Sequence, residues 1–135
     1  MKILAVVIVF VVCCGFSCRY DETCNPIRTG EEVVLLHGKS YCLDNPAYEL
    51  IITDISEGRC PEGVICFWQG EVTVSFSLKT ESAEHEFILK SVLNPADTTA
   101  GYIFSLLDVL PYPKYKQPVV LSDYRITLKI DKPDS

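Results

Sequence analysis

The sequence is short of the residues and motifs on which most enzymes and nucleic-acid-binding proteins depend. Its 135 residues include two histidines, one tryptophan and one methionine. The 12 lysines and arginines are outnumbered by 18 aspartates and glutamates. Because neutralising phosphates requires clustered lysine and arginine, we expect no nucleic-acid partner. The Gly-x-Ser-x-Gly elbow, the phosphate loop and the dinucleotide fingerprint are all missing from the chain.

The spacing of the histidines and cysteines does not match the common metal and redox motifs. Five residues separate Cys60 from Cys66, whereas a redox pair has two between its cysteines, and no nearby histidine completes a zinc site. His85 alternates in step with apolar neighbours, which predicts a partly buried side chain on a strand, and His37 is expected at the surface. We therefore expect no metal, no cofactor and no enzymatic activity. An unrecognised envelope hydrolase stays open as an alternative, because a pair of carboxylates needs no sequence motif.

Long helical patterns are also missing, and apolar side chains alternate with polar ones instead. This alternation is clear over residues 71–79 and 124–130, and it predicts strands with one buried face. The expected strands are Glu32–His37, Tyr48–Ile55, Glu71–Lys79, Glu84–Lys90, Tyr102–Val109, Pro118–Leu121 and Tyr124–Ile130. Six to eight short strands with glycine and proline turns predict an all-β antiparallel sandwich or barrel over residues 24–131. Residues 132–135 form a polar tail.

The first eighteen residues have the order of a secretory signal peptide. Lys2 supplies a charged start, residues 3–12 are an unbroken apolar run, and the small residues Gly15 and Ser17 precede Cys18. This order resembles the lipobox of bacterial lipoproteins, in which the chain is cut before a cysteine that then carries lipid. The resemblance implies a signal peptide over residues 1–17, lipid on Cys18 and a tether over residues 18–23. Cleavage near Cys14 and ordinary secretion remain alternatives.

The same resemblance implies a cellular location. We expect an exported protein anchored to the bacterial outer membrane, facing the periplasm or the surface. Arg19 follows the lipid-bearing cysteine, and no aspartate stands there to resemble the inner-membrane retention signal. The acidic chain argues against electrostatic docking on anionic lipid, so attachment has to come from the lipid itself.

The number of cysteines fits this processing. The chain has seven cysteines, and cleavage before Cys18 removes Cys13 and Cys14. With Cys18 carrying lipid, four cysteines remain, and an even number is typical of a secreted disulfide framework. We expect disulfides between Cys60 and Cys66 and between Cys24 and Cys42.

Residues 59–71 form the most distinctive segment of the chain. If a strand begins near Val64, then Cys66, Trp68 and Gly70 share one face, and Trp68 is expected to fill the core beside the disulfide. Gly70 would leave room for the indole or mark a bulge. The alternative is an exposed recognition aromatic at a loop rim. Arg59 lies among three glutamates, which predicts a surface ion pair of little energy.

This segment has the order Arg-Cys-Pro-x-x-Val-x-Cys-x-Trp-x-Gly-Glu, followed by an alternating strand. Together with Leu110-Pro111-Tyr112-Pro113 and Asp123-Tyr124 before the last strand, it resembles a family of small uncharacterised bacterial lipoproteins and secreted proteins. The chain departs from that family at Glu57-Gly58, where Asp-Ser is common. The resemblance implies export and a β fold, and it implies no activity.

Two polar segments are candidate binding loops. Asn94, Thr98, Thr99 and Tyr102 lie in a turn-rich stretch that resembles the Asn-Pro-Thr-Thr-Gly-Tyr loop of chagasin-type cysteine protease inhibitors, which implies a secreted inhibitor as an alternative function. The second segment holds two aromatic rings and two cations, and its residues are Tyr112, Lys114, Tyr115 and Lys116. It is either an exposed connection stiffened by proline or a patch for an acidic or glycan partner.

Taken together, these patterns predict a binding or structural module of the bacterial cell envelope. We expect a monomer whose partners are the membrane, through its lipid, and an unknown protein or glycan.

Overall fold

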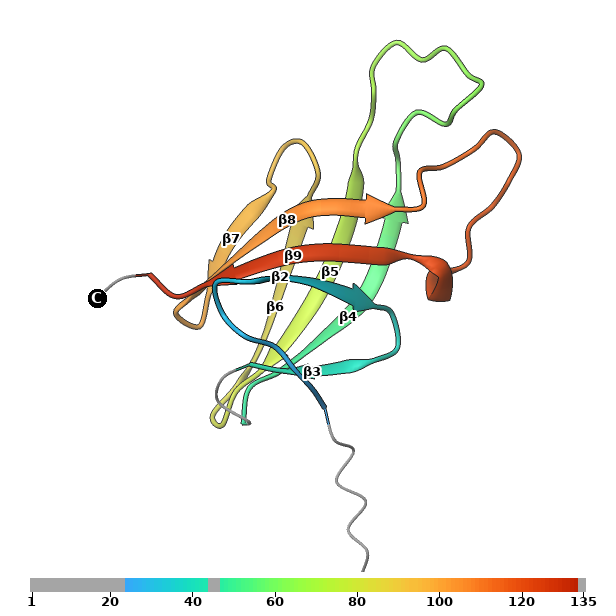
Figure 1. The fold of residues 1–135 in the computed structure, drawn as a ribbon. Helices are drawn as coiled ribbons and strands as arrows, with labels where there is room; N and C mark the ends of the chain where they lie inside the picture. The colour runs from blue at the N-terminus through green and yellow to red at the C-terminus, as the bar shows by residue number, and fades with distance from the viewer. Residues whose placement is uncertain (1–23, 44–46, 134–135) are drawn as a thin grey trace, which may run out of the picture.

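The computed structural model describes residues 24–43 and 47–133, and in this part of the chain nine strands form two facing sheets (Figure 1). The strands are β1 (Asn25–Pro26), β2 (Glu32–Leu36), β3 (Ser40–Cys42), β4 (Glu49–Glu57), β5 (Val72–Lys79), β6 (Glu84–Lys90), β7 (Ala96–Thr99), β8 (Tyr102–Leu110) and β9 (Arg125–Asp131). One sheet has the order β1-β3-β4-β5-β6 and the other the order β2-β9-β8-β7. The expected all-β fold is confirmed, and it is a sandwich of two sheets that do not close into a barrel.

The alternating side chains line the space between the sheets. Along β5, Val72, Val74, Phe76 and Leu78 are buried, and β9 buries alternate residues in the same way. The ring of Phe87 in β6 stacks on Phe76 at 5.1 Å between centroids and also meets Phe104 of the opposite sheet at 4.6 Å. Aromatic contact across the layers therefore joins the two sheets at the centre of the core.

Two local expectations are wrong. The strand expected over residues 118–121 does not form, and the segment enters the 3₁₀-helix η1 (Leu121–Asp123), because Pro118 has no N–H to give to a strand ladder. The segment over residues 94–102, expected as a loop, is a β-hairpin in which β7 pairs with β8. Its turn places Ala100 and Gly101 at φ values of 51° and 81°.

Both expected disulfides are present. Cys24–Cys42 joins the start of the described chain to β3, and Cys60–Cys66 closes a small loop between β4 and β5. Such bonds persist in oxidising compartments and are rare in the cytosol, so the domain belongs outside the cytoplasm. Over residues 24–43 and 47–133, the structure contains no helix long and apolar enough to cross a membrane. The predicted signal peptide, Cys18 and the tether lie outside the described residues.

The two disulfides are expected to contribute unequally to stability. Their sequence separations are 18 and 6 residues, so cross-linking removes more chain entropy in the first case. Replacing both Cys24 and Cys42 by alanine should cost about 3 kcal/mol, and replacing both Cys60 and Cys66 about 2 kcal/mol. Urea unfolding of the two double variants measures this difference. A larger loss for the Cys60 and Cys66 variant would contradict the loop-length argument.

Candidate functional site: the loop end of the sandwich

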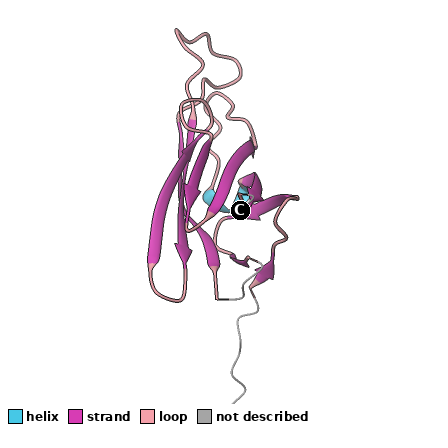
Figure 2. Ribbon diagram, turned by 90° about the vertical axis from the view of Figure 1, so that its left-hand side faces the viewer, coloured by secondary structure: helices cyan, strands magenta, loops and turns pink. Residues whose placement is uncertain are grey.

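Two long loops meet at one end of the sandwich, which we call the loop end. They are the β4–β5 loop, residues 58–71, and the β8–β9 loop, residues 111–124 (Figure 1). The backbone N–H of Glu62 donates to the carbonyl oxygen of Pro113 at 2.9 Å, and that of Tyr115 donates to the carbonyl oxygen of Glu62 at 3.1 Å. The two loops are therefore hydrogen-bonded to each other, and they extend beyond the strands at the same end of the sandwich (Figure 2).

The loop end lies far from the N-terminal end of the domain. Pro26 in β1 pairs with Cys42, and Cys42 pairs with Glu49, the first residue of β4. The β4–β5 loop begins after Glu57, the last residue of β4. The start of the described chain and the loop end thus lie at opposite ends of the same strand (Figure 1).

The neck of the β4–β5 loop is a close backbone contact between two glycines. A Cβ atom on Gly70 would lie 1.9 Å from the carbonyl oxygen of Gly58, and one on Gly58 would lie 2.7 Å from the carbonyl oxygen of Glu71. Across the same neck, the N–H of Cys60 donates to the carbonyl oxygen of Gln69 at 2.7 Å. The expectation that Gly70 leaves room for an indole is therefore wrong, because the space it leaves is filled by backbone.

Residues 65–68 of this loop carry three large apolar side chains in contact with solvent. Relative to an extended chain, Ile65 is 101% exposed, Phe67 is 113% exposed and Trp68 is 58% exposed. We call these three residues the apolar tip. The expectation that Trp68 fills the core is wrong, because β5 begins only at Val72 and the left-handed conformation of Gly70 interrupts the alternation. The alternative of an exposed aromatic at the loop rim describes its position.

The exposure of Trp68 can be measured directly, because it is the only tryptophan in the chain. We expect its fluorescence to be red-shifted in the folded protein, with little further shift on unfolding, and to be readily quenched by iodide. An indole that remains in water experiences a polar environment in both states. A blue-shifted emission that iodide leaves unquenched would place Trp68 in the core instead.

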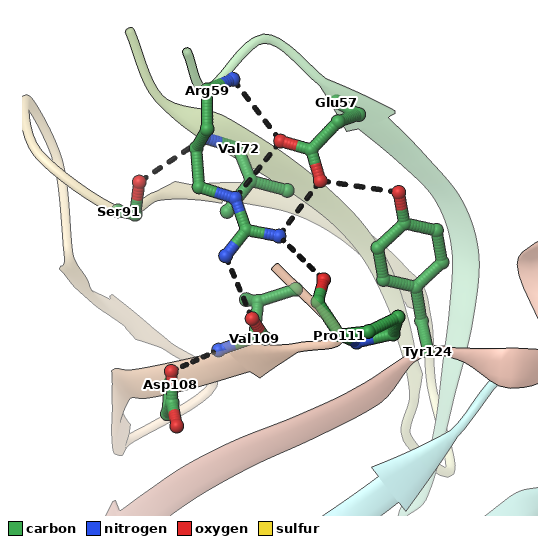
Figure 3. A network of polar contacts seen from close by, with 8 residues as sticks. All are labelled: Glu57, Arg59, Val72, Ser91, Asp108, Val109, Pro111 and Tyr124. Atoms are coloured by element: carbon green, nitrogen blue, oxygen red, sulfur yellow. Dashed lines mark hydrogen bonds and ion pairs between the residues drawn. The ribbon is translucent and has the colours of Figure 1, made fainter. Parts of the chain in front are cut away.

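Arg59 ties the two loops together (Figure 3). Its Nε and Nη2 atoms donate to the two carboxylate oxygens of Glu57 at 2.9 and 2.7 Å, and its backbone N–H donates to the same carboxylate at 3.0 Å. The guanidinium also donates to the carbonyl oxygen of Val109, near the end of β8, at 2.7 Å and to that of Pro111, the first residue of the β8–β9 loop, at 3.1 Å. The guanidinium also lies 4.8 Å from the ring centre of Tyr112.

This pair is not the weak surface ion pair that the sequence suggested. The side chains of Arg59 and Glu57 are only 10% and 22% exposed, and their contact is bidentate. Charge-assisted hydrogen bonds of this kind are shorter and stronger than neutral ones, and partial burial shields them from salt. The expectation failed because the two carbonyl acceptors lie 50 and 52 residues away along the chain.

The Arg59 contacts set the protonation of Glu57. Burial alone would raise the pKa of Glu57, but the hydrogen bonds and charge of Arg59, together with the Tyr124 hydroxyl, outweigh it and lower the pKa below its ordinary value of 4.5. The Tyr124 hydroxyl donates to Glu57 at 3.1 Å. Burial and the nearby carboxylate in turn raise the pKa of Tyr124. Glu57 is therefore an anion, and Tyr124 a neutral donor, across the physiological range.

The structure places the two groups of predicted binding residues on different segments of the chain. Tyr112, Lys114, Tyr115 and Lys116 are all exposed at the loop end, and the Lys116 ammonium lies 5.2 Å from the ring centre of Tyr115. In the other group, Thr98, Thr99 and Tyr102 lie at the β7–β8 turn. Asn94 lies in the β6–β7 connection, where the N–H of Leu93 donates to the Glu71 carboxylate of the β4–β5 loop at 3.1 Å.

Within that second group, Tyr102 is a core residue and the prediction of a binding role for it is wrong. Its side chain is 4% exposed and packs near Phe104, with which it shares a strand face. Asn94 donates its side-chain amide to the carbonyl oxygen of Ile88 at 3.2 Å, and Thr99 donates its hydroxyl to Asp97 at 3.1 Å. These contacts are internal to the strands and turns, so the segment is ordered as part of the sheets.

The sequence prediction did not include Ile65 and Phe67. A usable signal existed, because two large apolar residues lie within or beside a loop closed by a disulfide of short separation, where no core can cover them. The structure thus defines a disulfide-bonded two-sheet β domain that presents an apolar tip on a cross-linked loop. No protein-family model, curated protein or solved structure matches the chain.

Proposed function

We propose that this protein is a lipid-anchored binding module of the bacterial cell envelope and that the loop end carries its binding surface. The apolar tip is the observation on which this rests. Ile65 and Phe67 each forgo about 1.5–3 kcal/mol of burial by remaining in water. A partner that covers them recovers this free energy, and aromatic residues such as Trp68 are typical anchors of protein interfaces.

The construction of the loop supports a preformed surface. The disulfide between Cys60 and Cys66, the backbone bonds across the glycine neck and the Arg59 contacts all hold the loop before any partner arrives. A preformed loop loses little conformational entropy on binding, so more of the burial free energy appears as affinity. The tip projects outward, and it therefore suits an apolar cavity on a partner protein.

The position of the anchor supports a partner away from the membrane. If lipid is attached to Cys18, only the five residues from Arg19 to Thr23 separate the anchor from the disulfide-bonded Cys24. The nine residues of β4 alone extend about 30 Å, and the loop end lies beyond them. The resemblance of residues 59–71 to envelope lipoproteins fits the same arrangement. We infer that the tip faces a protein that stands above the anchoring membrane.

Site-directed crosslinking in the producing bacterium tests the binding surface. A photoreactive phenylalanine analogue in place of Phe67 should give one dominant protein adduct after illumination. The same analogue in place of Thr53, an exposed residue of β4, serves as the control and should give none. Equal labelling at the two positions, or no adduct at position 67, would rule out the loop end as the binding surface.

The anchor has its own test. The protein should fractionate with membranes, and the Cys18→Ser variant should be released in soluble form if lipid on Cys18 holds it there. Mass spectrometry of the N-terminal peptide should then find the lipid on Cys18. A wild-type protein that is soluble and unmodified would refute the anchor while leaving the crosslinking result intact.

A further inference from the structure

Besides the apolar tip, the loop end contains a small cavity that the proposed function does not use. Its volume is about 230 Å³, and it lies within the β8–β9 loop. Its apolar lining residues are Pro111, Tyr112, Pro118 and Val119. Its polar lining residues are Lys114, Gln117 and Asp123. Since a water molecule occupies about 30 Å³ in the liquid, the cavity has room for one ring-sized group.

The walls of this cavity are held in place without a ligand. The Tyr112 ring is covered by the Arg59 guanidinium at 4.8 Å, and Arg59 itself is fixed by Glu57 and by two carbonyl groups. Arg59 itself is not among the lining residues of the cavity. The N–H of Gln117 donates to the carbonyl oxygen of Lys114 at 3.1 Å, which closes the turn that carries these two polar lining residues.

The mixture of apolar and polar lining residues limits the class of ligand that the cavity can bind. A purely apolar ligand would take water from Lys114 and Asp123 without replacing their hydrogen bonds, which costs free energy. A simple ion would meet one cation and one anion, whose charges cancel. A neutral molecule with one apolar face and several hydroxyl groups matches both kinds of lining residue, because the ammonium and the amide can donate while the carboxylate accepts.

We propose that this cavity binds one pyranose ring of a neutral glycan, with the C–H face of the sugar against Tyr112. The hydroxyl groups of the sugar then meet Lys114, Gln117 and Asp123. This site is separate from the apolar tip and would give the module a second, carbohydrate contact at the same end of the domain. A tyrosine ring can serve as a flat apolar surface for the sugar, because the side chain has few conformations and so holds the ring in one orientation.

Nuclear magnetic resonance titration of the domain with methyl β-D-glucopyranoside tests this proposal. The sugar should shift the backbone amide signals of Tyr112, Gln117 and Val119 in a saturable way and leave those of the apolar tip unchanged. Affinity is expected in the millimolar range, since a single ring offers little surface. Glycerol, which has hydroxyl groups but no ring face, and sodium acetate, which has only charge, should give no saturable shift.

Two tyrosines of the same loop supply matched variants. Tyr112→Ala should weaken sugar binding by about tenfold or more. Tyr115→Ala removes an exposed ring that does not line the cavity, and it should change the affinity by less than about twofold. Gln117→Ala, on an exposed side chain, should also weaken binding and serves if Tyr112→Ala does not fold.

The proposal is overturned if the sugar gives no saturable shift, if glycerol gives the same shifts, or if Tyr115→Ala weakens binding as much as Tyr112→Ala. Phe67→Ser should leave sugar affinity unchanged, whereas it removes the side chain on which the protein-binding surface depends. A negative sugar titration therefore does not bear on the proposed protein-binding surface, and a negative crosslinking result does not bear on the proposed sugar site.

Discussion

Replacing Gly70 by alanine is expected to lower the free energy of unfolding by about 4 kcal/mol or more, a loss that few single substitutions produce. The added Cβ atom would lie 1.9 Å from the carbonyl oxygen of Gly58. That neighbour is backbone and cannot rotate away as a flexible side chain could. Gly70 also has a φ of 67°, which adds about 1–2 kcal/mol of strain for any residue with a side chain.

Gly38→Ala is the matched control for this prediction. Gly38 has a φ of 83°, but a Cβ atom placed there meets nothing within 4 Å. The control therefore carries the backbone strain without the collision, and its cost should be about 1–2 kcal/mol. Urea unfolding followed by circular dichroism measures both variants. Equal losses in the two variants would show that the neck of the β4–β5 loop relaxes freely, against the close contact described above.

The strands could be predicted because they depend on a local signal. In β5 and β9, burial of alternate residues follows directly from the alternation in the sequence. The same signal could have corrected the prediction for Tyr102, since it stands two residues before the buried Phe104 on the same strand. Assigning Tyr102 to a binding loop ignored the strand pattern that begins with it.

Trp68 and Arg59 could not be placed from the sequence for different reasons. The prediction for Trp68 assumed that the alternation of buried and exposed residues in β5 continues back through Gly70. The left-handed conformation of Gly70 ends this alternation, because it interrupts the extended backbone of the strand. For Arg59, the glutamates close to it in the sequence were visible, but its acceptors at the end of β8 and the start of the β8–β9 loop were not. The loop end is built by pairing two distant loops, and that pairing has no periodic signature.

Arg59→Ala is expected to lower the free energy of unfolding by about 4 kcal/mol at neutral pH, because it leaves the partly buried Glu57 carboxylate without its cation. The carbonyl groups of Val109 and Pro111 would lose their donor as well. Lys129→Ala is the control, since Lys129 and Asp131 form an ion pair at 3.5 Å with side chains 43% and 35% exposed. Removing such an exposed pair should cost less than about 1 kcal/mol.

The loss in Arg59→Ala should also depend on pH in a direction set by Glu57. The folded-state pKa of Glu57 lies below its ordinary value of 4.5, so the unfolded chain takes up a proton first as the pH falls. The stabilisation from the pair is therefore fully present above about pH 4.5 and declines as the pH falls through the lowered pKa. Urea unfolding of the wild type and the variant from pH 7 to pH 3 should show the two stabilities converging. A difference that stays constant over this range would mean that Arg59 stabilises the loop end through its carbonyl contacts and the Tyr112 ring rather than through Glu57. In that case the charge of Glu57 would contribute nothing to holding the two loops together.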